Sequence, residues 1–297
     1  MYDARKSNGG AGQSSLVFGL IIFAVVALAF FGILMMPKGT SNSKPAMPGL
    51  AQTDAEFLNI LDDNATRKYV TTLTRVAPRS ADKLGRDAAD AIASGASDDE
   101  LAFLVMQSLE GDMLKNVRHL AKADVKHFDA FLKMSKGGLR KLSSTRSKWC
   151  RGSYYEQFAS QSPAQIEQMI YQEFGYGSGG YTWGIGLNTL LLEAIEDAKS
   201  NPKSYGSTTA EDDRAMQSLM MRMITNPQIM QLMALQGQDE ATITRAVSNL
   251  DFCSLGVTGI EALQSLPKET RGRLWAEGFK QMKNGGLEKA MRQMGVS

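Results

Sequence analysis

Residues 16–36 read LVFGLIIFAVVALAFFGILMM, a run without a charged side chain. At 1.5 Å per helical residue this stretch is long enough to cross a bilayer core of about 30 Å. It would therefore separate a short N-terminal tail from the rest of the chain. A cleaved signal peptide has a shorter apolar stretch of about 7 to 15 residues, followed by a small-residue cleavage site. The sequence that follows here, PKGTSNSKPAMPG, offers only a poor site of that kind. We therefore expect residues 16–36 to be retained as a single transmembrane helix.

The charges that flank this helix bear on its orientation. Two basic residues precede it and two follow it before residue 50, so the usual count of cytoplasmic Lys and Arg is tied. The free amino terminus tips the balance toward a short cytoplasmic tail, residues 1–15, and a soluble region on the non-cytoplasmic side. Residues 37–50 are rich in proline, glycine and small polar residues, which is typical of a flexible tether. The sequence thus predicts a single-pass membrane protein.

The chain has the composition of a folded protein. Hydrophobic residues make up 43% and charged residues 22%, a balance that excludes a largely disordered protein. The formal net charge of +2 creates no overall field that would attract nucleic acid. Any electrostatic partner must therefore be recognised by a local group of charges.

Helical signals dominate beyond the tether, and the alternation typical of strands is almost absent. Capping boxes, in which a Ser or Thr and a Glu or Gln three residues later satisfy free backbone N–H groups, are predicted to begin at Thr53, Ser97, Ser162 and Thr258. Pro163 suits the first turn of a helix that begins after Ser162. We expect helices at about 51–62, 64–76, 80–93, 98–109, 111–135, 163–174, 187–200, 210–225, 227–236, 239–250, 259–265 and 268–294.

The predicted fold class is therefore all-α: an N-terminal transmembrane helix followed by a multi-helix soluble domain. Weak periodicity and many Ser, Gly and basic residues between 137 and 161 favour a basic connecting segment there. It would separate an N-terminal helical lobe, residues 51–136, from a C-terminal helical lobe, residues 162–297.

The helix predicted at 111–135 has an apolar face and a basic face. Residues 115–151 contain eleven Lys and Arg against two Asp, a local net charge of +9. The candidate binding residues are Lys115, Arg118, Lys122, Lys126, Lys133, Arg140 and Lys141. Two interpretations remain open: a solvated face balanced by acidic stretches of the same molecule, or a surface for anionic lipid head groups or an acidic protein. Nucleic acid is the least favoured anionic partner.

Residues 174–186 read FGYGSGGYTWGIG and formally contain the spacing G-x-G-x-x-G. A dinucleotide loop must follow a strand, whereas a helix is predicted to precede this segment, so we reject that interpretation. Two interpretations remain: a tight connection in which glycine allows close backbone approach, or a flexible aromatic lip that presents Tyr176, Tyr181 and Trp183 over a cleft.

Reactive groups give little support for catalysis. Cys150 and Cys253 follow the predicted transmembrane helix on the same side of the membrane, and they are either a disulfide or two buried thiols. The two histidines, His119 and His127, do not share a helix face as metal ligands at i, i+4 do. We expect no catalytic residue, metal or cofactor, and Glu173 is only a weak candidate for the general acid of a glycan hydrolase.

Methionine is abundant, with 17 residues in the chain, and many gather between 216 and 233. Filling of an irregular core is the favoured interpretation, and an adaptable binding groove is the alternative.

Together these features favour a membrane-tethered helical interaction or scaffolding protein that supports assembly of a larger membrane-associated complex. Its expected partners are the membrane, through the N-terminal helix, and proteins of that complex. The alternatives are an anchored envelope enzyme acting on a glycan polymer and a cytoplasmic-facing nucleic-acid tether.

Overall fold

The computed structural model describes residues 57–108, 116, 118–156, 161–235 and 238–283. Within these ranges the chain is helical and contains no strand, so the all-α fold class is confirmed for this part. None of the described helices combines the length and apolar character needed to span a membrane. The predicted tail, transmembrane helix and tether, residues 1–50, lie outside the described residues.

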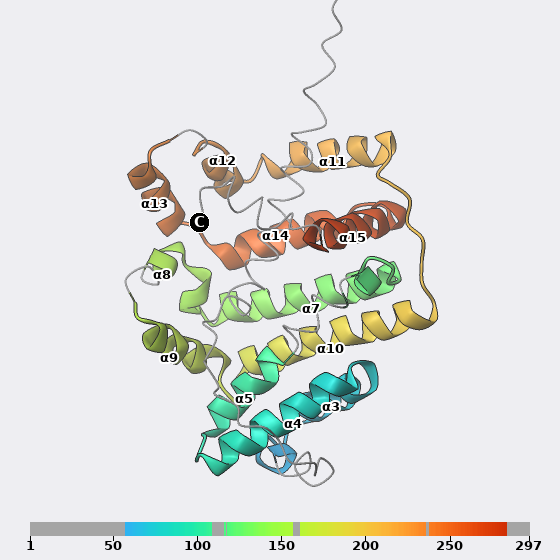
Figure 1. Ribbon diagram of the computed structural model, residues 1–297. Coiled ribbons are helices and arrows are strands. Elements are labelled where there is room, and N and C mark those ends of the chain that lie inside the picture. The colour runs from blue at the N-terminus through green and yellow to red at the C-terminus, as the bar shows by residue number, and fades with distance from the viewer. Residues whose placement is uncertain (1–56, 109–115, 117, 157–160, 236–237, 284–297) are drawn as a thin grey trace, which may run out of the picture.

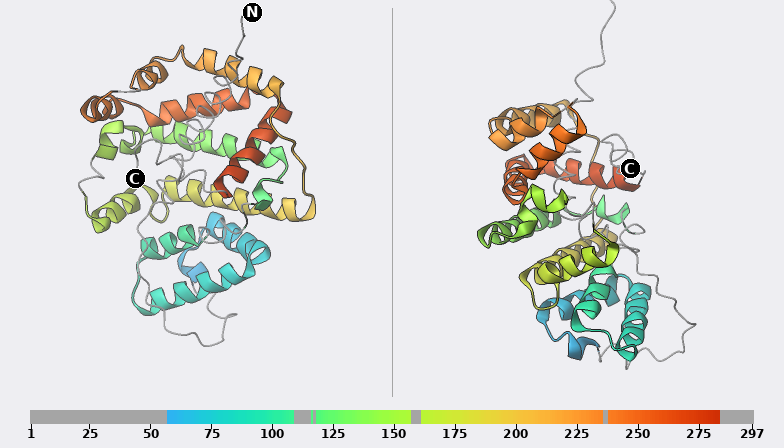
Figure 2. Two further views of the ribbon diagram at one scale, coloured as in Figure 1. Left: turned by 45° about the horizontal axis from the view of Figure 1, so that its top comes forward. Right: turned by 90° about the vertical axis from the view of Figure 1, so that its left-hand side faces the viewer.

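The helices stack in layers, which Figures 1 and 2 show from three directions. In the order of the stack, α3 to α5 form one end, α10 and α7 lie in the middle, α14 and α15 follow, and α11 to α13 form the outer layer at the other end. Their bounds are α3 (Asn64–Val76), α4 (Pro78–Ala93), α5 (Asp98–Gln107), α7 (Val125–Ser144), the 3-10 helix η1 (Lys148–Cys150), α8 (Gly152–Glu156), α9 (Pro163–Phe174), α10 (Gly179–Ser200), α11 (Ala210–Met223), α12 (Pro227–Met233), α13 (Glu240–Ser248), α14 (Phe252–Gln264) and α15 (Lys268–Lys283).

Helix α10 is buried because it has neighbours on both sides, α3 and α7. Its side chains at Tyr181, Ile185, Leu192 and Ile195 are at most 1% exposed. They belong to a hydrophobic cluster that extends through all the layers. The predicted boundary at 137 falls inside α7, and α10, assigned to the C-terminal lobe, packs against α3 of the N-terminal lobe.

Glycine allows α7 and α10 to approach closely. A Cβ atom on Gly138 of α7 would lie 2.3 Å from the indole ring of Trp183 of α10. The Trp183 Nε1 donates a hydrogen bond of 3.2 Å to the backbone oxygen of Met134. Gly138 therefore lies inside α7 rather than in a linker, and the indole fills the space that a side chain there would need.

Helix starts follow local capping chemistry. The capping boxes predicted at Ser97 and Ser162 are confirmed. The one predicted at Thr258 is wrong, because Thr258 lies inside α14, where Asp251 caps the first turn by accepting a hydrogen bond from the Ser254 N–H. The box predicted at Thr53 lies outside the described residues.

The continuous helix predicted at 111–135 is also wrong. A turn at residues 121–123 interrupts it, and α7 begins only after Asp124, whose carboxylate accepts a hydrogen bond of 3.0 Å from the Lys126 N–H. Aspartate stabilises a new helix start more than it does a helix interior, so the cap overrides the amphipathic pattern. α7 then continues to Ser144, past the predicted end.

Candidate interaction surfaces

Two of the predicted basic residues pair with acids of neighbouring helices. The Lys126 ammonium on α7 lies 3.1 Å from the carboxylate of Asp197 on α10. The Arg140 guanidinium lies 2.5 Å from Glu261 on α14. At these positions the positive charge faces an acidic group of the same molecule, while both cationic side chains remain more than half exposed to solvent.

The other described candidates are exposed. Arg118, Lys122, Lys133 and Lys141 are exposed, and no ion pair is found for them within the described ranges. Arg118 contacts His119, whose pKa is lowered by burial and then by nearby cations. Lys115 lies outside the described residues. The exposed cations are therefore spread along α7 and the turn before it rather than gathered around one ligand.

The end of α7 has an unusual backbone conformation. Arg146, just after the helix, has a φ of 53°, in the left-handed region that glycine adopts most easily. The Ser147 N–H then donates to the Leu142 carbonyl over 2.9 Å, which closes the helix end. Arg146 is exposed, and no contact among the described residues explains why this position is not glycine.

The aromatic and glycine-rich segment is mostly helix rather than loop. Ser178 caps α10 by accepting a hydrogen bond of 2.9 Å from the Tyr181 N–H, so the helix begins eight residues earlier than predicted. Only residues 175–178 connect α9 to α10. A Cβ atom on Gly180 would lie 2.7 Å from the Phe174 ring, so this connection uses glycine for close approach.

The three aromatic side chains of this segment pack inward to different degrees. Tyr181 is 0% exposed, its hydroxyl lies 2.6 Å from that of Thr66 on α3, and burial raises its pKa. Trp183 is held against α7. Tyr176 is partly buried, packs edge-on against Tyr181, and its N–H donates to Asp99. A flexible lip is therefore wrong for Tyr181 and Trp183, because both are fixed by tertiary contacts.

Glu173 contributes to the packing between η1 and α9. Its carboxylate accepts a hydrogen bond of 2.8 Å from the Ser147 hydroxyl. Two residues are conceivable as a second carboxylate for glycan hydrolysis, Glu156 and Glu193. The Glu156 side chain lies outside the described part of the structure, and Glu193 is paired with Lys68 of α3 at 2.8 Å. Hydrolysis of a glycan requires two carboxylates facing one substrate, whereas Glu173 is engaged with Ser147 just before η1 and Glu193 with Lys68 of α3.

A disulfide joins Cys150, the last residue of η1, to Cys253 in the first turn of α14. Their Cα atoms are 4.9 Å apart, and 103 positions separate them in the sequence. The two segments also run side by side here, since the Gly152 N–H donates to the Leu250 carbonyl over 2.9 Å. A Cβ atom at Gly152 would lie 1.7 Å from the Val247 oxygen, so only glycine fits.

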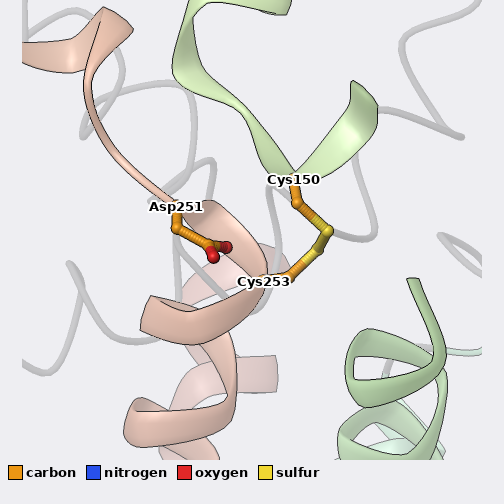
Figure 3. Close-up of side chains that lie close together, drawn as sticks. All are labelled: Cys150, Asp251 and Cys253. Atoms are coloured by element: carbon orange, nitrogen blue, oxygen red, sulfur yellow. A yellow bond between two sulfur atoms is a disulfide. The ribbon is translucent and has the colours of Figure 1, made fainter. Parts of the chain in front are cut away.

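Figure 3 shows the carboxylate of Asp251 beside this disulfide. Its oxygen and the two sulfur atoms lie within 4.8 Å of one another, a spacing that would suit a metal ion. Metal binding needs thiolates, and here each sulfur is bonded to the other. The Asp251 carboxylate meanwhile caps α14. The arrangement is therefore a covalent and hydrogen-bonded junction.

The outer layer is attached to α15 by a buried ion pair. Asp212 on α11 is 1% exposed and accepts hydrogen bonds of 2.6 and 2.8 Å from the Arg273 guanidinium. These bonds hold the pKa of Asp212 well below its ordinary value. Asp212 also completes a capping box with Thr209, which sequence analysis did not identify because Asp stands where Glu or Gln is usual.

The solvent side of the outer layer carries exposed hydrophobic side chains. Met221 of α11 is 67% exposed, Met230 and Met233 of α12 are 57% and 47% exposed, and Ile243 of α13 is 37% exposed. We call these four residues the methionine face. Other methionines of the same helices, Met216 and Met223, are buried and fill the core as expected.

An uncharged stretch of sequence carries two of the four residues of this face, Met230 and Met233. Residues 223–238 read MITNPQIMQLMALQGQ, without Asp, Glu, Lys or Arg. Depletion of charge and enrichment of methionine are typical of the centre of a protein–protein interface. This uncharged run is the signal from which the methionine face might have been found in the sequence, although exposure itself depends on tertiary neighbours.

Comparison with protein-family models, curated proteins and solved structures found no significant match to this chain. Its function has to be inferred from the surfaces described above.

Proposed function

We propose that this chain is a membrane-tethered interaction protein whose methionine face docks onto another protein in a membrane-associated assembly. The observation that carries the proposal is the exposure of four large hydrophobic side chains on three consecutive helices of one layer. Burying a side chain of this size contributes about 1.5 to 3 kcal/mol, so a partner that covers several of them would gain stability from the contact.

The membrane tether rests on the sequence of residues 16–36. A hydrocarbon-length helix followed by a short flexible segment would hold the soluble domain beside the bilayer. Tethering raises the local concentration of partners in the same membrane, so a modest docking surface is sufficient.

The disulfide supports the non-cytoplasmic side for the soluble domain. Disulfides persist in oxidising compartments and are rare in a reducing cytosol. Free thiols can be alkylated before lysis, and the protein then reduced and treated with a second label. We expect Cys150 and Cys253 to escape the first reagent and both to react with the second, because they are bonded to each other. Two thiols that react in the first step would place the domain in a reducing compartment instead.

Crosslinked capture from native membranes tests the docking surface. We expect wild-type protein to capture a defined set of proteins, and Met221→Glu with Met230→Glu to lose it, because a charge would be buried without a partner. Thr71→Glu on α3 is the matched control, since Thr71 is exposed and α3 lies at the opposite end of the stack (Figure 1). A captured set that is the same in all three proteins would contradict the proposal.

A further inference from the structure

We infer that the exposed side of α7 contacts anionic phospholipid head groups of the membrane that holds the chain, an inference that rests on the membrane tether of the proposed function. Lys126, Lys133 and Arg140 follow one another at intervals of seven residues, which is close to two helical turns. Since α7 is one continuous helix, these three side chains lie along one line of its surface. We call them, together with the neighbouring Lys141, the basic stripe.

The side chains of the basic stripe reach solvent along its whole length. Lys126 and Arg140 are 61% and 59% exposed even with their acidic partners in place. Lys133 and Lys141 are exposed as well, and no ion pair within the described ranges involves either of them. Gly137, between Lys133 and Arg140, is exposed, and a Cβ atom there would have no heavy atom within 4 Å. The stripe is therefore accessible to an external partner in its middle as well as at both ends.

The ion pairs on this side of α7 leave a surplus of positive charge. Asp197 of α10 pairs with Lys126, and Glu261 of α14 is shared by Arg140 and Lys136. In the described part of the chain, these are the two carboxylates that pair with the stripe or with Lys136. Five cations therefore face two carboxylates, and the difference is available to an external anion.

Two further acids of this region are bound elsewhere. Asp129 accepts hydrogen bonds of 2.7 and 2.9 Å from the guanidinium of Arg271 on α15. Asp124, the cap of α7, lies 3.8 Å from the ammonium of Lys203. Each of these pairs is neutral, so the surplus of charge on the stripe remains.

The stripe suits a lipid surface better than a protein partner. The centre of a protein–protein interface is apolar and depleted in charge. The large hydrophobic side chains exposed in the described part of the chain are Tyr155 and the four of the methionine face, and α7 carries none of them. Head groups of a fluid bilayer move independently, so cations spread over roughly 21 Å of helix can each meet a phosphate.

The predicted tether is long enough for this contact. Residues 37–56 separate the predicted transmembrane segment from the first described residue, Phe57. Twenty residues span at most about 70 Å, whereas α7 is roughly 30 Å long. The tether therefore permits α7 to lie along the membrane plane, and it keeps the stripe close to the lipid, so few charges are sufficient. The inference requires anionic phospholipid in the leaflet that faces the domain.

Fluorescence quenching of the full chain in lipid nanodiscs tests the contact. A dye on Gly137→Cys would lie within the stripe, since a Cβ atom there points into open space. A quencher carried on the head group of a neutral lipid should reduce its emission about twofold more in discs with about 30% phosphatidylglycerol than in discs of phosphatidylcholine. About 0.5 M NaCl should remove the difference, because it screens exposed charges. Equal quenching in the two lipids at low salt overturns the inference.

Two cations of the stripe without an ion pair in the described part of the chain give the decisive variant. Lys133→Gln with Lys141→Gln breaks no described ion pair and should lower the equilibrium constant for docking roughly twentyfold. Arg79→Gln with Arg214→Gln is the matched control, since it removes the same charge from exposed positions of α4 and α11, at the two ends of the stack (Figure 1). The control should be quenched like wild type. Equal losses in the two variants would assign the attraction to net charge and overturn the inference.

Lipid dependence and capture together separate this inference from the proposed function. Quenching that depends on phosphatidylglycerol, with the same proteins captured by Met221→Glu with Met230→Glu, keeps the stripe and overturns docking through the methionine face. Equal quenching in both lipids, with captured proteins lost in Lys133→Gln with Lys141→Gln, assigns the stripe to an acidic protein and overturns the lipid contact. A chain that fails to insert into discs of either lipid overturns the tether and this inference with it.

Discussion

Hydrophobic side chains differ in exposure between helix α10 and the outer layer of α11 to α13. α10 has helices on both sides, so its large apolar side chains are almost completely buried. The outer layer packs on one side only, and its methionines divide accordingly: Met216 is 5% exposed and Met221, five positions later on the same helix, is 67% exposed. The comparison shows that a helix with neighbours on both sides buries its large apolar side chains, whereas in the outer layer the side of the helix on which a methionine lies decides whether it is core or surface.

The largest expected effect comes from removing the disulfide that links η1, beside the inner layers, to α14 under the outer layer. Replacing Cys150 and Cys253 together by Ser should lower the free energy of unfolding by about 4 to 5 kcal/mol, because a loop of this length gains much entropy in the unfolded chain. Urea denaturation measures the change. Wild type treated with reductant is the control and should match the double variant, and equal stability of oxidised and reduced protein would contradict the prediction.

Truncation of one side chain in each region tests the comparison directly. Leu192→Ala in α10 should cost about 3 kcal/mol, since it leaves a cavity in a region with neighbours on both sides. Met230→Ala in the outer layer should change the stability of the monomer by less than about 0.5 kcal/mol, as for other exposed positions. Thermal or urea unfolding of both variants, measured where the chain is monomeric, decides the matter. Similar costs at both positions would mean that Met230 is covered within one molecule.

The attachment of the outer layer to α15 should depend on pH. The pKa of Asp212 is depressed in the folded state, so its stabilisation is complete above the ordinary pKa near 4 and is lost as pH falls below it. Asp212→Asn should therefore cost about 2 kcal/mol at pH 7, less than a fully buried pair because Arg273 is partly exposed.

The dependence of stability on pH in the acid range supplies the control for this prediction. Between about pH 5 and 2 the stability of wild type should fall more steeply than that of Asp212→Asn, because the variant lacks the titrating group. Parallel curves across this range would show that the ion pair with Arg273 does not stabilise the layer.

The smallest effect is expected to have the opposite sign. Arg146→Gly should stabilise the protein by up to about 1 kcal/mol, because glycine adopts the left-handed conformation after α7 without a steric cost. Arg146→Ala serves as the control, since it removes the charge and retains the Cβ atom. Equal stability of the Gly and Ala variants would show that the backbone conformation is not the cause.

Local capping chemistry explains how far the sequence predicted the fold. The helices at Asn64–Val76 and Pro163–Phe174 have the predicted bounds, because Asp63 and the Ser162 box fix their starts within a few residues. The start of α10 was missed, since glycine pairs favour loops in isolation. There the Lys141 side chain of α7 fills the space beside Gly179, and the end of α9 fills the space beside Gly180; the contact with α7 is one that no local pattern reports.

The candidate surfaces were harder to predict for a related reason. The basic pattern was visible in the sequence, but its partners Asp197 and Glu261 lie 71 and 121 positions away from Lys126 and Arg140, on other helices. The methionine cluster was also visible, while its division into buried and exposed members depends on which side of each helix faces the neighbouring layer. The charge and type of a residue can be read from the sequence, whereas the neutralisation of a basic side chain and the burial of a methionine depend on how the helices pack.

The bond between Cys150 and Cys253 also determines what a protease could release. Every peptide bond between these two positions lies within one covalently closed ring, which includes α10 and the whole of the outer layer. A single cut in the loops that join those helices would leave both pieces attached, and they would separate on a gel only after reduction. A protease can thus cut one loop of the outer layer without releasing that layer from the rest of the protein.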